Sequence, residues 1–135
     1  MFDETASRPG GKVDIRPGDA MPEDSKIILE KANAAMAAGD TEGFLAHCTE
    51  DTEWNFVGDR TLRGKAAVRA YLAEAYGKPP KFDASDLIAE GEFVTALGEI
   101  TITGKDGREA SYWYCDVWSL RGGKLDKLRA FVVEQ

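Results

Sequence analysis

The chain has 135 residues, of which 43% are hydrophobic and 30% charged, and its formal net charge is −7 at pH 7. This length and composition predict a single globular domain that folds unaided. Because Lys and Arg are not clustered, the charge excludes a nucleic-acid surface and an anionic membrane surface.

Further sequence signals favour a cytoplasmic protein without a metal. No stretch approaches the roughly 20 apolar residues of a membrane-spanning helix, and the N-terminus lacks the apolar core of a signal peptide. Cys48 and Cys115 lack the spacing of a zinc or redox motif and are interpreted as free thiols. For His47, the single histidine, pairing with Glu50 or Asp51, or capping of helix carbonyls, is favoured over catalysis.

The first part of the chain is predicted to be a flexible tail. Residues 1–21 hold several prolines and glycines and few large apolar side chains, so they cannot bury enough surface to order themselves. A short edge strand through Val13 and Ile15 is the alternative. The folded domain is predicted to cover residues 22–135.

Three helices are predicted in the first half of this domain. Pro22 suits a first helical position, and the helix that it begins stops at Gly39. Asp40 suits the cap of a second helix over residues 41–48, and a third helix covers residues 65–76. Residues 52–57 alternate in polarity and predict a strand between these two helices. The apolar face of the first helix is formed by Ile28, Ala32, Ala35 and Met36.

Only strands are predicted after the third helix. Four segments with strand character are separated by turns that contain glycine, which favours an antiparallel meander. One of these turns holds Gly122, Gly123 and Lys124, but it joins two strands and leads into no helix, so no phosphate loop and no cofactor is expected. The fold class is therefore α+β, with the helices packed on one face of the sheet. The strands are predicted over residues 81–90, 92–103, 108–120 and 124–134.

Four segments have sequences specific enough to be compared with known protein families. They are AAGD at 37–40, CTEDTEWNFVG at 48–58, LRGKAAVRAYL at 62–72 and YCDVWSLRGGKLDKLRAFV at 114–132. Together they resemble the SnoaL-like branch of the NTF2-like superfamily, which includes ketosteroid isomerases and polyketide cyclases. The resemblance implies three N-terminal helices packed on a strongly curved, mainly antiparallel sheet. It also implies a cone with a pocket at its open end and a homodimer formed through the outer face of the sheet.

The alternation of the predicted strand 108–120 agrees with a pocket on one side and a partner on the other. Both faces of this strand are too apolar for free exposure to water. One face should therefore line the interior, and the other should contact a protein partner. The first face carries Tyr112, Tyr114, Asp116 and Trp118, and the second carries Trp113, Cys115, Val117 and Ser119.

Asp116 is the most informative polar residue, because it interrupts a run of aromatic and apolar side chains. A buried carboxylate costs several kcal/mol unless it is paired, hydrogen-bonded or protonated. The resemblance aligns Asp116 with a protonated aspartate of ketosteroid isomerases that donates a hydrogen bond to an oxyanion. The alternative is a structural role in which Asp116 binds a neighbouring group such as Arg129.

The other catalytic positions of ketosteroid isomerases are not matched. Their general-base aspartate aligns with Asn55 or Phe56, neither of which accepts a proton usefully, and their oxyanion tyrosine aligns with Asn33. The usual isomerase mechanism is therefore not expected. An acid-base reaction centred on Asp116, as in the polyketide cyclase branch, stays open.

Three functions are compatible with these residues: an acid-base isomerase, cyclase or hydrolase acting on an apolar carbonyl-bearing or cyclic substrate, a module that binds an apolar small molecule, and a dimeric association domain. Asp116 favours the first, and the missing base favours the other two. The catalytic candidates are Asp116, Asn33 and Tyr114. The candidate ligand-binding residues are Trp54, Asn55, Phe56, Tyr112, Trp118, Leu128, Ala130 and Val132.

Overall fold

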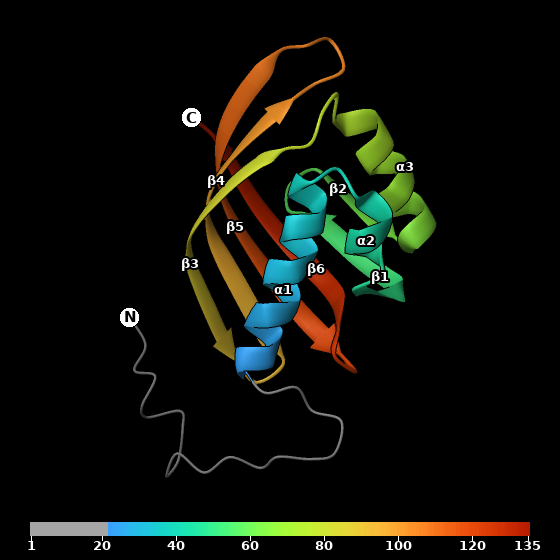
Figure 1. The fold of residues 1–135 in the computed structure, drawn as a ribbon, viewed down its shortest axis with the longest axis vertical. Helices are drawn as coiled ribbons and strands as arrows, with labels where there is room; N and C mark the ends of the chain where they lie inside the picture. The colour runs from blue at the N-terminus through green and yellow to red at the C-terminus, as the bar shows by residue number, and fades with distance from the viewer. Residues whose placement is uncertain (1–21) are drawn as a thin grey trace.

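The computed structural model describes residues 22–135, so the predicted tail lies outside the described residues. Helices α1 and α2 come first, strands β1 and β2 follow, and α3 precedes the four long strands β3 to β6 (Figure 1). The elements are α1 (Pro22–Ala37), α2 (Thr41–Leu45), β1 (Cys48–Phe56), β2 (Arg60–Arg63), α3 (Lys65–Ala75), β3 (Lys81–Glu90), β4 (Phe93–Thr103), β5 (Glu109–Arg121) and β6 (Lys124–Glu134).

All six strands belong to one sheet in the order β2-β1-β6-β5-β4-β3. Strand β1 runs parallel to β6 and every other pair is antiparallel, so the sheet is mixed. The sheet bends around the helices, which lie on its inner side (Figure 1). This is the α+β layering that the sequence predicts, with one parallel pair added.

The helices do not form a single N-terminal block, because β1 and β2 lie between α2 and α3. Residues 60–63, for which no strand is predicted from the sequence, form β2 on the free side of β1. The predicted second helix is too long: α2 ends at Leu45, and Cys48 begins β1. Strand pairing explains this correction, since the Leu125 N–H donates to the His47 carbonyl at 2.8 Å and thereby extends the sheet past the helix.

The residues predicted to end the first helix and to cap the second do so in the connection between α1 and α2. Gly39 takes a positive φ of 81°, and the Asp40 side chain accepts a hydrogen bond from the Gly43 N–H at 2.9 Å. Helix α1 turns Leu29, Ala32 and Met36 into the core, all at 5% exposure or less. The inner side of this helix is therefore fixed against the sheet.

The inner face of β4 carries alternate residues of the strand, of which Val94, Ala96 and Ile100 are buried. Gly98 continues this face beside the point where β3 changes register between Ala84 and Asp86. A Cβ atom at Gly98 would lie 2.2 Å from the Asp83 carbonyl oxygen, which is far inside van der Waals contact. Glycine therefore allows β3 and β4 to approach each other closely.

We expect Gly98→Ala to destabilise the fold by about 1–3 kcal/mol, because the added methyl group must push the β3 backbone away from β4. Urea denaturation followed by circular dichroism measures the change. Thr95→Ala, on the opposite face of the same strand, is the control and should cost less than about 1 kcal/mol. Equal losses for the two variants would contradict the close-approach argument.

Candidate functional site

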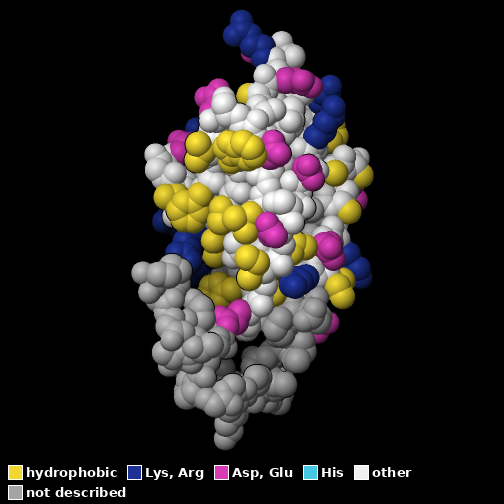
Figure 2. All heavy atoms as spheres, turned by 90° about the vertical axis from the view of Figure 1, so that its left-hand side faces the viewer, with side chains coloured by type: hydrophobic (Ala, Val, Ile, Leu, Met, Phe, Trp, Pro, Cys, Tyr) yellow, Lys and Arg dark blue, Asp and Glu magenta, His cyan; other side chains and the backbone are white. Residues whose placement is uncertain are grey.

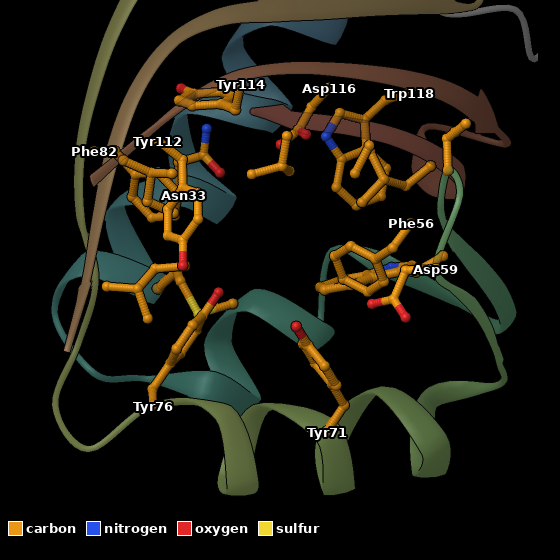
Figure 3. Close-up of a pocket in the computed structure, with 18 of the residues that line it drawn as sticks. Asn33, Phe56, Asp59, Tyr71, Tyr76, Phe82, Tyr112, Tyr114, Asp116 and Trp118 are labelled. Carbon is orange, nitrogen blue, oxygen red and sulfur yellow. The ribbon is translucent and has the colours of Figure 1, made fainter. Parts of the chain in front are cut away.

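A pocket of about 350 Å³ lies between α1, α3 and the inner face of the sheet (Figure 3). This volume is in the range of small-molecule sites, roughly 300–1,000 Å³. Most of its wall is aromatic or aliphatic. The lining residues are Asn33, Met36, Phe44, Trp54, Phe56, Val57, Asp59, Tyr71, Tyr76, Phe82, Ile100, Ile102, Tyr112, Tyr114, Asp116, Trp118, Leu128, Ala130 and Val132.

The period of two residues in a β-strand explains how β5 contributes to the pocket. Tyr112, Tyr114, Asp116 and Trp118 alternate along the strand, and all four line the cavity. Strand β6 supplies the neighbouring wall through Leu128, Ala130 and Val132. The inner face of this hairpin is therefore the main surface that a bound molecule would contact.

Aromatic rings close one side of the pocket. The Trp54 ring lies edge-on to Phe44 and to Trp118, at 5.6 Å between centroids in each case. Phe56 packs against Tyr71 of α3 at 5.0 Å. These contacts join β1, α2, β5 and α3 into a rigid apolar wall suited to flat or cyclic ligands.

Asp116 is the half-buried acidic group of this pocket. Its neighbours on the adjacent strands are Ala96 and Ala130, which offer no side-chain donor. In the described part of the chain its carboxyl group makes no ion pair or side-chain hydrogen bond. Burial therefore raises the pKa of Asp116 from 3.8 to about 7.

Arg129, the alternative partner considered for Asp116, lies on the other face of the sheet. It is paired in register with Val117, whose side chain points away from the pocket, and it borders a groove on the outer face. The geometry therefore does not support the structural pairing of Asp116 with Arg129.

The remaining catalytic candidates reach the same pocket from two elements. Asn33 points into it from α1, on the same side as Asp116 and Tyr114 (Figure 3). Tyr114 is only 6% exposed, and its hydroxyl is buried with no hydrogen-bond partner among the described residues. Burial, with the charges of Asp116 and Asp83 adding to it, raises the pKa of Tyr114 to about 12, so this phenol stays neutral.

One ligand-binding candidate lies elsewhere. Asn55 faces the outer side of the sheet, where its side-chain oxygen accepts a hydrogen bond from the Thr61 hydroxyl at 3.4 Å. Phe56, the next residue, faces the pocket. The position of the isomerase base is therefore occupied either by an amide that faces outward or by a phenyl ring that faces inward, depending on the alignment. His47 lies between α2 and β1 and does not line the pocket.

The sequence analysis missed three polar groups of the pocket: Asp59, Tyr71 and Tyr76. Tyr71 lies at helical spacing from the buried residues Val68 and Leu72 of α3, and this spacing was a usable signal. Asp59 follows Gly58, whose φ of 86° forms the turn between β1 and β2, and only this turn carries the carboxylate to the pocket mouth. Tyr76 stands just after α3 in an extended conformation that helix periodicity does not predict.

Among the described residues no group of three His, Cys, Asp or Glu side chains is arranged to hold a metal ion. No helix in residues 22–135 is long and apolar enough to span a membrane. The pocket chemistry available from these residues is therefore that of carboxyl, amide, phenol and indole groups.

The mixed sheet, the inner helices and the enclosed pocket define an NTF2-like α+β protein. Residues 29–127 match the family model of the SnoaL-like domain. The chain belongs to the SnoaL-like family, which confirms the resemblance found in the sequence. No curated protein matches the sequence.

Solved structures with this fold extend the comparison. An NTF2-like protein from Burkholderia xenovorans LB400 is 26% identical, with 83% of this chain and 91% of that chain covered and a TM-score of 0.67. The epoxide hydrolase/cyclase-like enzyme SalBIII, described for its role in pyran ring formation in the polyether salinomycin, is 22% identical, with 82% and 91% covered and a TM-score of 0.74. An LEH-like epoxide hydrolase of M. tuberculosis is 17% identical, with 82% and 84% covered and a TM-score of 0.74. The last two show a shared fold.

The raised pKa of Asp116 predicts that stability falls as pH rises from about 4 to about 7. In this interval the folded state retains a proton that the unfolded state has lost, so the free energy of unfolding decreases by about 1.4 kcal/mol per pH unit. Asp116→Asn should remove this contribution and be more stable than the wild type at pH 8. Urea denaturation between pH 4.5 and 8 measures both effects.

Glu74→Gln is the matched control, because Glu74 is exposed on α3 and outside the pocket. Its pH profile should follow that of the wild type. Parallel profiles for the wild type and Asp116→Asn would show that Asp116 does not take up a proton in this range.

Proposed function

We propose that the protein binds a small, mostly apolar molecule in this pocket and that Asp116 acts on it as a general acid. The neutral carboxyl group donates a hydrogen bond, or transfers its proton, to a carbonyl or ring oxygen of the substrate. The reaction class is an isomerisation, a cyclisation or the hydrolytic opening of a ring.

One observation carries this proposal: a carboxyl group without a charged partner stands in an apolar pocket. A general acid works best when its pKa lies near the operating pH, and the pKa of about 7 meets this condition. A carboxylate in the same place would repel the negative charge that develops on a carbonyl oxygen. The protonated form stabilises this charge instead.

Asn33 and Tyr114 are proposed to orient the substrate oxygen. The Asn33 side-chain amide offers a second donor from α1, on the same wall of the pocket as Asp116 (Figure 3). Tyr114 stands two residues from Asp116 on the same face of β5 and limits where a substrate ring can lie. The rings of Trp54 and Trp118 then hold the apolar body of the substrate.

The fold relatives add support for a cyclic substrate. SalBIII and the M. tuberculosis protein are described as epoxide hydrolase/cyclase-like and as an epoxide hydrolase. The oxygen of a strained ring accepts a proton when it opens, and a neutral carboxyl group can supply that proton. The present chain is proposed to carry out a reaction of this class.

The second candidate function is ligand binding without turnover. It is favoured because Asp59 is the other carboxylate among the described lining residues, and it lies exposed at the pocket mouth, 3.5 Å from Arg60. No base therefore stands beside Asp116 to activate a water molecule or remove a proton. In this reading the same pocket stores or carries an apolar ligand.

Binding of 4-phenylcyclohexanone, followed by tryptophan fluorescence, tests the role of Asp116. The affinity should be constant below pH 6 and fall by about tenfold per pH unit well above pH 7, as the donor is lost. Asp116→Asn, which keeps an amide donor, should bind the ketone with no pH dependence. A pH-independent affinity of the wild type would contradict the proposal.

Turnover of styrene oxide then separates the two functions. If the pocket is catalytic, Asp116→Asn should lower the rate of ring opening by about 10²–10⁴-fold, the usual contribution of a general acid. Product formation by chromatography is the measurement. Ketone binding that depends on Asp116, together with no hydrolysis above background, would favour the binding module.

The outer face of the sheet is proposed to bind a second copy of the chain. Large apolar side chains are exposed there although no pocket needs them, and Figure 2 shows them gathered on this side among scattered charges. Arg129 and Lys127 lie on β6 and Asp86 on β3, on the same face of the sheet and with β5 and β4 between them. A two-fold axis between them would bring opposite charges together. The apolar residues are Phe93, Trp113, Phe131 and Val133.

Analytical ultracentrifugation at micromolar concentration should therefore show a dimer. Trp113→Glu should give a monomer that keeps its fold, because Trp113 is 54% exposed in the single chain and a charge there would be buried in the dimer. Ile27→Glu on α1, where the side chain is also exposed, is the control and should leave the dimer intact. A monomeric wild type would rule out the interface.

A further inference from the structure

All four tyrosines of the chain line the same pocket. Tyr114 stands on the wall that holds Asp116 and Asn33. Tyr71 and Tyr76 rise from the opposite wall, at α3 and just after it, and Tyr112 reaches toward them from β5 (Figure 3). The polar groups of the pocket are therefore divided between two sides, with an aromatic section between them.

The hydroxyls of Tyr71, Tyr76 and Tyr112 have no hydrogen-bond partner in residues 22–135. The three side chains are half-buried, and their hydroxyls remain open to the cavity, unlike the enclosed hydroxyl of Tyr114. Moving a phenol hydroxyl out of water costs free energy when the protein offers no hydrogen-bond partner in return. A bound molecule can supply this partner. These three groups are thus available to a ligand.

The side chains of Tyr71, Tyr76 and Tyr112 extend into the same part of the cavity (Figure 3). Burial raises the pKa of Tyr76, and Tyr71 adds to this rise. Burial also raises the pKa of Tyr71, with Asp59 and Tyr112 adding to it and Arg60 opposing it. The phenols of Tyr71 and Tyr76 are therefore neutral near pH 7. A phenol hydroxyl can both donate and accept a hydrogen bond.

Local structure fixes this group in place. The Tyr71 ring is held between Phe56, at 5.0 Å, and the Arg60 guanidinium, 5.7 Å from the ring centroid. After Tyr76, the Gly77 N–H donates to the Thr103 carbonyl at 2.7 Å, which ties the end of α3 to β4. The hydroxyls are therefore positioned before any ligand arrives, which lowers the entropy cost of binding.

We propose that Tyr71, Tyr76 and Tyr112 form a second polar subsite, which binds a hydroxyl group at the far end of a ligand whose carbonyl oxygen faces Asp116. The preferred ligand is then a rigid molecule with an oxygen at each end and an apolar middle. A hydroxyl fits better than a second carbonyl, because the Asp59 carboxylate beside Tyr71 only accepts hydrogen bonds. This inference rests on the proposed function, which places the carbonyl at Asp116.

A matched pair of ketones tests the subsite: 4-phenylcyclohexanone and 4-(4-hydroxyphenyl)cyclohexanone, which differ only in the distal hydroxyl. The wild type should bind the hydroxylated ketone about 3- to 10-fold more tightly, the gain expected from one or two hydrogen bonds. Tyr71→Phe, Tyr76→Phe and Tyr112→Phe should each reduce this ratio toward one, because each variant keeps the aromatic ring and removes only the hydroxyl. Isothermal titration calorimetry gives both dissociation constants.

Tyr114→Phe is the control, because its hydroxyl is enclosed on the Asp116 side of the pocket. It should change both affinities by the same factor and leave the ratio unchanged. Equal binding of the two ketones by the wild type would overturn the subsite and leave the role of Asp116 standing. If neither ketone binds, the proposed function fails, and the subsite fails with it.

Discussion

The parallel pairing of β1 with β6 is the contact on which the pocket depends. It brings the first strand of the chain beside the last, so that Trp54 lies next to Leu128 and Phe56 next to Ala130. Side-chain hydrogen bonds fix the start of this pair: the Thr52 hydroxyl donates to the Asp126 carbonyl at 2.7 Å, and the Thr49 hydroxyl donates to the Asp126 carboxylate at 2.8 Å. Without this contact, the β1–β2 hairpin and the helix α3 that packs on it would not enclose the inner face of β5.

Asp116 links the stability of this protein to its proposed chemistry. A carboxyl group among apolar side chains is tolerated here because it can take up a proton and because the pocket, not the packed core, surrounds it. A paired Asp116 would make the fold more stable near neutral pH but would remove the donor. The unpaired carboxyl group therefore lowers the stability of the fold near neutral pH. A role in a functional site explains its presence better than a role in packing does.

Much of the pocket could be predicted from the sequence, because strand and helix periodicities determine which side chains face inward. The alternation in β5 placed Tyr112, Tyr114 and Trp118 beside Asp116, and the family alignment indicated Asn33, which also lines the pocket. Periodicity fails where an element ends or where pairing partners are distant in sequence. For this reason α2 was predicted too long, β2 was missed, and Asn55 was placed inside although it faces out.

The polar groups of the opposite wall illustrate the same limit. The position of Asp59 depends on a turn, and that of Tyr76 on a hydrogen bond between the following glycine and β4. Such contacts between distant segments leave no periodic trace in the sequence. The family resemblance predicts the cone and its pocket, but the positions of these polar groups depend on turns and on the ends of elements.

The β-bulge in the middle of β3 affects how this sheet can meet other molecules. Strand β3 is an edge of the sheet, and a long regular edge offers unpaired backbone groups to which a strand of another chain can add. The register shift between Ala84 and Asp86 breaks this repeat, and the exposed acids Asp83, Asp86 and Glu90 add repulsion between like copies. Edge-to-edge growth of the sheet into aggregates is thereby discouraged, while the broad outer face stays open to a partner.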